Sequence, residues 1–249
     1  MTMQPGKIWI GTSNGQMPGN KDTFPPEYQD KSRLHYYSTL LNSIEVNSCF
    51  YKTPLRSTYE KWEKEVPEDF KFTLKLSKDI THHPELNGDQ NCMNNFLQAA
   101  TGIRNKQGCL LIQFPGKISI DHFNQVEEIL IQLRLLDPEQ KWKIAIEFRN
   151  ESWYIGETTE LLNEYNAAMV MHDFPKGKIS SITTKANFVY LRFHGPTGNY
   201  RDSYSDQFLN DKTELIKELS GSGKEIYAYF NNTAGNAFEN ARYLKSLLF

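Results

Sequence analysis

The chain has 249 residues, enough to bury about three quarters of its unfolded surface, so it can fold without disulfides or a metal. Its 28 basic and 30 acidic residues give a formal net charge of -2, which excludes a strong general attraction to nucleic acid or an anionic membrane. No apolar run approaches the roughly 18 residues of a membrane span. The stretch MTMQPGKIWIGTS lacks the apolar core of a signal peptide. We therefore expect a soluble cytoplasmic protein with no membrane partner.

Short β-type runs alternate along the chain with longer segments of helical character. The eight predicted strands are IWIGTS (8–13), IEVNSCFY (44–51), FKFTLKLS (70–77), GCLLIQFP (108–115), WKIAIEFR (142–149), AAMVMHDF (167–174), FVYLRFHG (188–195) and EIYAYFNN (225–232). They begin about 20 to 40 residues apart, which is the spacing of βα units in a parallel sheet rather than of hairpins.

Apolar residues at three- and four-residue intervals predict helices between these strands. The helical patterns contain Leu34, Tyr37 and Leu41, then residues 119–136, then Leu161, Leu162 and Tyr165, and finally residues 236–249. Residues 175–187 are too short and too β-branched for a full helix, so we expect a short or missing sixth helix. Eight βα units predict a single (β/α)8 TIM-type barrel over residues 1–249. A doubly wound sheet is disfavoured because GTSNGQMPG lacks the dinucleotide-binding spacing.

Alternate strand residues differ sharply in polarity. Apolar side chains at one parity would face the helices, as in Val189, Leu191 and Phe193. The opposite parity carries Glu45 and Asn47, Thr73 and Lys75, Gln113, Glu147 and Arg149, Arg192 and His194, and Tyr227, Tyr229 and Asn231. In a parallel barrel these residues point into the interior, and most lie at the carboxyl end of their strand, where barrel enzymes place their chemistry.

Two structural alternatives explain the same alternation without a site. An antiparallel sheet with one solvated face also alternates, although the βα spacing argues against it. An internal ion-pair network of Lys75, Glu147, Arg149 and Arg192 is the second alternative, despite the desolvation cost of buried charges. His82 and His83 lie in a loop, THHP, where histidines are commonly solvated. His172 and Asp173 have opposite parity, so at most one should face inward.

The charges at this parity favour an anion over a metal. No HExxH, HxH or clustered-carboxylate spacing is present, and three cysteines share no metal-ligand spacing. Lys75, Arg149 and Arg192 would repel a divalent cation, whereas arginine forks match carboxylate or phosphate. The sequence therefore predicts no metal and no cofactor. NNTAGNA, after the last strand, leads into a helix whose first N–H groups are a further candidate for a phosphate.

Several motifs together resemble the YecE-like family, also called domain of unknown function 72. They are GTSN, IEVNSCFY, FKFTLKLSKDITH, LLIQFP, AIEFRNESW, YLRFHGP and YAYFNNTAGNAFENA, in order from about Ile8 to Phe249. The resemblance implies a TIM barrel but no reaction. The motif positions include Ser13, Tyr51, His82, Trp153, Asp173 and Asn232. One departure is NGQMPGN after GTS, where relatives continue with Gly, Trp and another aromatic residue.

We predict an enzyme or ligand-binding barrel acting on a small anionic or polyhydroxylated molecule, with acid/base residues Glu147 and His194 and with Asp173 as a third catalytic candidate. Hydrolase, lyase and isomerase chemistry all stay open. The substrate-binding candidates are Ser13, Glu45, Asn47, Tyr51, Lys75, Gln113, Arg149, Trp153, Arg192, Asn231 and Asn232. The alternatives are a non-catalytic metabolite sensor and a metal-dependent phosphodiesterase, and the acidic charge does not favour nucleic acid as partner. Oligomeric state is not predicted.

Overall fold

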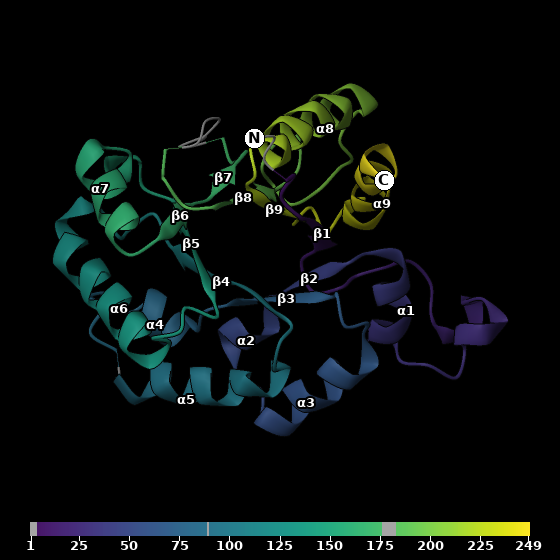
Figure 1. Ribbon diagram of the computed structural model, residues 1–249, viewed down its shortest axis with the longest axis horizontal. Coiled ribbons are helices and arrows are strands. Elements are labelled where there is room, and N and C mark those ends of the chain that lie inside the picture. Colours follow the sequence, from purple (N-terminus) through teal and green to yellow (C-terminus); the bar gives the residue numbers. More distant parts are fainter. Residues whose placement is uncertain (1–3, 89, 176–182) are drawn as a thin grey trace.

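The computed structural model describes residues 4–88, 90–175 and 183–249, and in them helices surround parallel strands (Figure 1). One sheet has the order β1-β9-β8-β7 and the other the order β2-β3-β4-β5-β6. The strands are β1 (Ile8–Thr12), β2 (Ser43–Val46), β3 (Lys71–Lys75), β4 (Gln107–Phe114), β5 (Lys143–Phe148), β6 (Ala167–Met169), β7 (Met171–His172), β8 (Phe188–Phe193) and β9 (Glu225–Phe230). Every strand pair is parallel, so the predicted parallel α/β class is confirmed.

Helices fill the connections between the strands. They are α1 (Arg33–Leu40), α2 (Ser48–Tyr51), α3 (Arg56–Glu65), α4 (Lys78–Thr81), α5 (Gln90–Ala100), α6 (Phe123–Leu136), α7 (Gly156–Glu164), α8 (Asp206–Gly221) and α9 (Ala237–Leu248). Short 3-10 helices cover Lys21–Thr23, Pro26–Tyr28, Thr101–Ile103, Ile120–His122 and Glu151–Trp153. Within the described ranges, no helix has both the length and the apolar character needed to cross a membrane.

Three details of the predicted elements need correction. The strand predicted over 44–51 ends at Val46, because Asn47 has helical backbone angles and starts α2. The run 167–174 divides at Val170 into β6 and β7, since Val170 N–H bonds back to Ile146 while the next pairs are made with β8. The questioned sixth helix falls mostly on residues 176–182, which lie outside the described residues; 183–187 are not helical.

The two sheets meet at two places. A parallel bridge pairs Ser13 with Glu45, just beyond β1, and Asn14 N–H donates to Glu45 O at 2.8 Å. On the other side only Val170 separates β6 from β7. The ladders nevertheless form two sheets rather than one continuous ring, so the described residues establish the parallel α/β arrangement and leave the closed barrel as a prediction.

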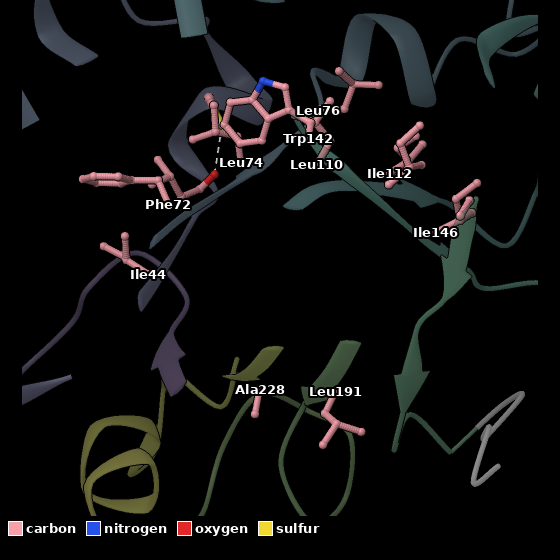
Figure 2. Packing of buried hydrophobic residues seen from close by; sticks show 14 of the residues in the cluster. Ile44, Phe72, Leu74, Leu76, Leu110, Ile112, Trp142, Ile146, Leu191 and Ala228 are labelled. Carbon is pink, nitrogen blue, oxygen red and sulfur yellow. Dashed lines mark hydrogen bonds between the residues drawn. The ribbon is translucent and has the colours of Figure 1, made fainter. Parts of the chain in front are cut away.

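Two buried clusters divide the apolar side chains by strand parity. The larger lies between strands and helices, and Figure 2 shows its members from β2, β3, β4, β5, β8 and β9, among them Ile44, Ile112, Ile146 and Leu191. The smaller contains opposite-parity residues from both sheets: Trp9, Cys109, Leu111, Ala145, Ala168, Val170, Ala186, Phe188, Tyr190, Tyr227 and Tyr229. The second cluster therefore packs beneath the carboxyl ends of the strands, where the polar residues follow.

Candidate functional site

Arg192, in β8, lies at the centre of a buried ionic cluster. Only 2% of the residue is exposed, and its Nε and Nη2 each donate to Glu45 of β2 at 3.0 Å. Its Nη1 donates to Glu147 Oε2 of β5 at 3.1 Å. Both carboxylates are completely buried, so these bonds join the two sheets through their interior side. The polar parity of the three strands produces this convergence.

Each carboxylate has further partners. Glu45 accepts hydrogen bonds from Ser13 Oγ and from the Tyr190 hydroxyl, both at 2.5 Å. Glu147 accepts one from Arg149 Nε, also at 2.5 Å, across two residues of the same strand end. Charge-assisted bonds of this kind compensate a buried carboxylate for its lost hydration.

Neighbouring cations decide the ionisation of both glutamates. Burial alone would raise the pKa of Glu147, but the charges of Arg192 and Arg149 outweigh it and hold the pKa well below its usual range. Burial also opposes ionisation of Glu45, and Arg192 again lowers the pKa below its ordinary value. Both groups are therefore acceptors and counter-charges at neutral pH, and Glu147 holds no proton to donate.

His194 is a neutral hydrogen-bond acceptor toward the arginines. Its Nε2 lies 2.9 Å from Arg149 Nη2 and 3.1 Å from Arg192 Nη1, and a guanidinium can only donate. The proton consequently belongs on Nδ1, which lies 3.3 Å from Asp173 Oδ1. Tyr204 donates its hydroxyl proton to the other oxygen of Asp173. Burial lowers the pKa of His194, in agreement with a neutral ring.

His172 and Asp173 both lie beside His194, so the expectation that at most one faces inward is wrong. The ring centroids of His172 and His194 are 6.0 Å apart, and Asp173 also accepts from the backbone N–H of His194. Asp173 follows the end of β7, where the alternation of a strand no longer holds. His172 is neutral: Nδ1 accepts from Phe174 N–H and Nε2 faces the Tyr154 hydroxyl.

Lys75 and Gln113 form the partly exposed side of the cluster, at the ends of β3 and β4. Lys75 Nζ donates to Gln113 Oε1 at 2.8 Å and lies 4.1 Å from the centroid of the Phe50 ring. Burial and, after it, the positive charge of Arg192 lower the pKa of Lys75 to about 8. Arg149 is likewise at the edge, with 10% of its side chain exposed. Its guanidinium carbon lies 4.1 Å from the Phe174 ring centroid.

The structure joins part of the predicted set and separates the rest. Hydrogen bonds connect seven of the predicted residues: Ser13, Glu45, Glu147, Arg149, Asp173, Arg192 and His194. Lys75 is bonded to Gln113, and the charges of this cluster act on the pKa of Lys75. Asn47 and Asn231 sit at the strand ends, and Asn47 Oδ1 is buried without a hydrogen-bond partner among the described residues.

Three predicted residues lie elsewhere. Trp153 is completely buried in the layer of helices, stacks on Phe148 at 4.3 Å and donates to Ile118 O. Tyr51, on α2, is 70% exposed, and within the described part of the chain no hydrogen bond joins it to the cluster. Asn232 turns toward α9, where its Nδ2 donates to Asn240 Oδ1. The presence of an aromatic or amide residue in a motif therefore did not predict whether its side chain points toward the cluster.

Tyr190, Tyr204 and Phe174 belong to the cluster although the sequence did not single them out. From the sequence, Tyr190 could not be distinguished from an aromatic residue that only packs in the interior. The available signal was that a buried Tyr hydroxyl needs a hydrogen-bond partner, and here it finds Glu45. Tyr204 is in an irregular segment, so no periodicity applies to it. His82 was expected to be a solvated loop residue. It is instead half-buried and packs on the Phe50 ring, which also contacts Lys75.

The described residues contain no group of three or more His, Cys, Asp or Glu side chains arranged to hold a metal ion. Asp173 and His194 are close to each other, but the nearest further ligand-type group, Glu147, is already bound by two guanidinium groups. The arrangement can hold protons at the Asp173–His194 pair and can present cations at Lys75 and Arg149.

Fold and site define a parallel α/β protein with a buried ionic cluster at the carboxyl ends of its strands. The family model described as "Protein of unknown function DUF72" matches residues 9–249, so the chain belongs to this family, as its motifs indicated. It is 27% identical to UPF0759 protein YunF of Bacillus subtilis, across 97% of this chain and 94% of that protein.

Solved structures of the family share the fold. A DUF72 family protein from Enterococcus faecalis aligns with a TM-score of 0.78 and 23% identity, covering 98% of both chains. Another from Thermotoga maritima aligns with a TM-score of 0.77 and 26% identity, covering 97% of this chain and 99% of that one. None of these descriptions names an activity.

Proposed function

We propose that the chain is a single cytoplasmic (β/α)8 barrel that binds a small anionic metabolite at the carboxyl ends of its strands. The second buried cluster supports the barrel, because it draws residues from β1, β4, β5, β6, β8 and β9 into one interior. The bridge from Ser13 to Glu45 and the single residue between β6 and β7 would complete the ring.

The proposal depends chiefly on one contrast within the site. The floor is neutral, because Arg192 and Arg149 balance Glu45 and Glu147, and the nitrogen atoms of Arg192 are bonded to these carboxylates and to His194. At the partly exposed edge, Lys75 contacts a neutral amide, and Arg149 has only Nε and Nη2 bonded within the described residues. A carboxylate or phosphate would complete the coordination of both cations.

Proton transfer is then assigned to His194 and Asp173 rather than to Glu147. Nε2 of His194 lies within hydrogen-bond distance of Arg149 Nη2 and of Arg192 Nη1. An anion that draws Arg149 toward itself would remove the shorter of these two contacts and make the nitrogen a better general base. Glu147 is a positioning residue for the two arginines. A barrel that binds without turnover, as a sensor, uses the same cations and differs only in leaving the bound molecule unchanged.

The test is thermal unfolding in the presence of inorganic phosphate, pyruvate or glycerol 3-phosphate. A ligand that binds only the folded state raises the melting temperature. At a ligand concentration of 100 times its Kd, the free energy of unfolding increases by about 2.7 kcal/mol. Lys75→Gln and Arg149→Gln should lose this increase. Lys71→Gln is the matched control: Lys71 lies on the same strand and parity but at the opposite end, where it donates to Asn105 O. An equal loss in Lys71→Gln, or no increase in the wild type, would overturn the proposal.

A further inference from the structure

Lys75 differs from the other charged residues of the cluster in its pairing. Glu45, Glu147, Arg149 and Arg192 all take part in ion pairs of 2.5 to 3.1 Å. Among the described residues, no carboxylate oxygen lies within 4.0 Å of Lys75 Nζ, whose hydrogen bond goes to the amide oxygen of Gln113. An amide accepts a hydrogen bond from an ammonium but does not neutralise it. Loss of the proton from Lys75 therefore breaks no salt bridge.

The surroundings of Lys75 also weaken its hold on a proton. Its side chain is largely buried against the Phe50 ring, and the positive charges of Arg192 and Arg149 act on it. Desolvation and a nearby cation are the two conditions under which a lysine becomes a nucleophile near neutral pH. They lower its pKa to about 8, so that about a tenth of the amine is unprotonated at pH 7.

We propose that Lys75 forms a reversible imine with a carbonyl compound that carries a carboxylate or phosphate, such as a 2-oxo acid or a keto-phosphate. The proposal rests on the anion site at Arg149 and specifies its substrate class. Lys75 is a partly exposed residue at the carboxyl end of β3, and Arg149, which would hold the anion, directly follows β5 at the same end of the strands.

The chemistry balances without a cofactor. The ammonium first releases one proton to solvent. The free amine lone pair then attacks the carbonyl carbon, a C–N bond forms, and the π pair of the carbonyl moves to oxygen, which takes the proton that the nitrogen now gives up, so the carbinolamine is neutral. Loss of that oxygen as water, with uptake of one proton, gives the protonated imine. The positive charge that Lys75 carried is thus conserved beside Gln113, where the amide oxygen can accept from the iminium N–H.

Borohydride trapping tests the imine directly. Wild-type protein is incubated with pyruvate or with dihydroxyacetone phosphate, reduced with sodium borohydride, and mapped by peptide mass spectrometry. We expect one reduced adduct at Lys75, formed at pH 8 on the order of 100-fold faster than at a lysine of ordinary pKa. Lys71, on the same strand, is a stringent internal control site, because burial lowers its pKa as well although it lies at the opposite end from Arg149. Labelling of Lys75 no faster than Lys71 would overturn the proposal.

Two further arms separate the imine from the anion site. Lys75→Arg keeps the cation but removes the nucleophile, so it should retain stabilisation by phosphate and lose the adduct. Arg149→Gln should slow trapping of pyruvate at least tenfold more than trapping of the neutral ketone hydroxyacetone, which reports the change in the amine itself when the Arg149 charge is removed. Stabilisation by phosphate without any adduct would refute the imine and leave the anion site standing. No stabilisation and no adduct would refute both.

Discussion

At the scale of single residues, Arg192 determines the geometry of the cluster. A guanidinium has five N–H donors in a rigid fork, and here they reach two carboxylates and one imidazole from three strands. Burying such charges is costly and contributes little to stability compared with apolar packing. The ion-pair network anticipated from the sequence is present in part: Glu147, Arg149 and Arg192 form it together with Glu45, whereas Lys75 has no carboxylate partner among the described residues. The network also fixes the position of Arg149 and the tautomer of His194.

Glu147→Gln should be strongly destabilising. The change leaves Arg149 without its carboxylate partner and Arg192 with only Glu45, so an incompletely compensated charge remains buried. We expect the free energy of unfolding, measured by urea denaturation, to fall by about 3–5 kcal/mol. Glu139→Gln is the control, because the Glu139 side chain is 72% exposed and its pair with Lys141 is solvated. A loss under about 1 kcal/mol for Glu147→Gln would contradict the role given to this pair.

Stability should fall as the pH is lowered from about 6.5 toward 4. Burial lowers the pKa of His172 to about 4, so the unfolded chain takes up a proton in this window and the folded chain does not. The pKa values of His82 and His194 are lowered in the same way. Glu45, Glu147 and Asp173 also have lowered pKa values, so the stability that they contribute is lost only in more acid solution.

His172→Gln isolates one of these contributions. The slope of unfolding free energy against pH between 6.5 and 5 should decrease by about 1 kcal/mol per pH unit, because the unfolded chain no longer takes up most of one proton at this position while the folded chain does not. The slope is compared rather than the absolute stability, which the substitution itself alters. His83→Gln, in an exposed loop position, serves as control. An unchanged slope in His172→Gln would show that this ring takes up its proton in the folded protein as readily as in the unfolded chain, which would contradict the lowered pKa.

At the scale of elements, alternation along the strands was the informative feature. It assigned Glu45, Glu147 and Arg192 to one side of the sheets, and the structure brings these three together. It failed where strands end: nothing in IEVNSCFY showed that Asn47 begins a helix, and parity misplaced Asp173 for the same reason. Tertiary contacts, not local pattern, also determine that Trp153 packs outward.

The approach of β1 to β2 depends on a glycine that the sequence did not identify. A Cβ added at Gly11 would lie 2.1 Å from Ser43 O, so a side chain there forces the two strands apart. We expect Gly11→Ala to lower the free energy of unfolding by about 1–3 kcal/mol, as overpacking does. Gly156→Ala, at the start of α7, meets no atom within 4 Å and should be neutral or slightly stabilising. Equal effects of the two substitutions would disprove the close approach.

At the scale of the whole molecule, interior side chains connect the sheets more than the backbone ladders do. The Tyr229 hydroxyl of β9 bonds to Ser43 of β2 at 2.5 Å and to Thr73 of β3 at 2.8 Å. Nearer the opposite end, Lys143 of β5 lies 3.5 Å from Glu225 of β9. With Arg192, these contacts join the two sheets at several depths, as the proposed barrel requires.

The two sheets should therefore unfold as one unit, and hydrogen exchange can establish this. In the wild type, amides of Ala228 and Leu191 in one sheet and of Ile112 and Ile146 in the other should open with free energies equal to within about 1 kcal/mol. Tyr229→Phe leaves Ser43 and Thr73 each without one hydrogen bond, at a cost of about 1–2 kcal/mol. That loss should appear equally in both sheets, because global unfolding exposes them together.

Tyr243→Phe provides the comparison for this experiment, since the Tyr243 side chain lies at the surface of α9 and its loss of a hydroxyl should leave every opening free energy unchanged. If Tyr229→Phe instead weakens protection at Ala228 and Leu191 while Ile112 and Ile146 keep theirs, the sheets are separate cooperative units. The single barrel would then be wrong. Equal weakening would show that the two sheets unfold as one cooperative unit, since Tyr229 belongs to one sheet and both its hydroxyl partners belong to the other.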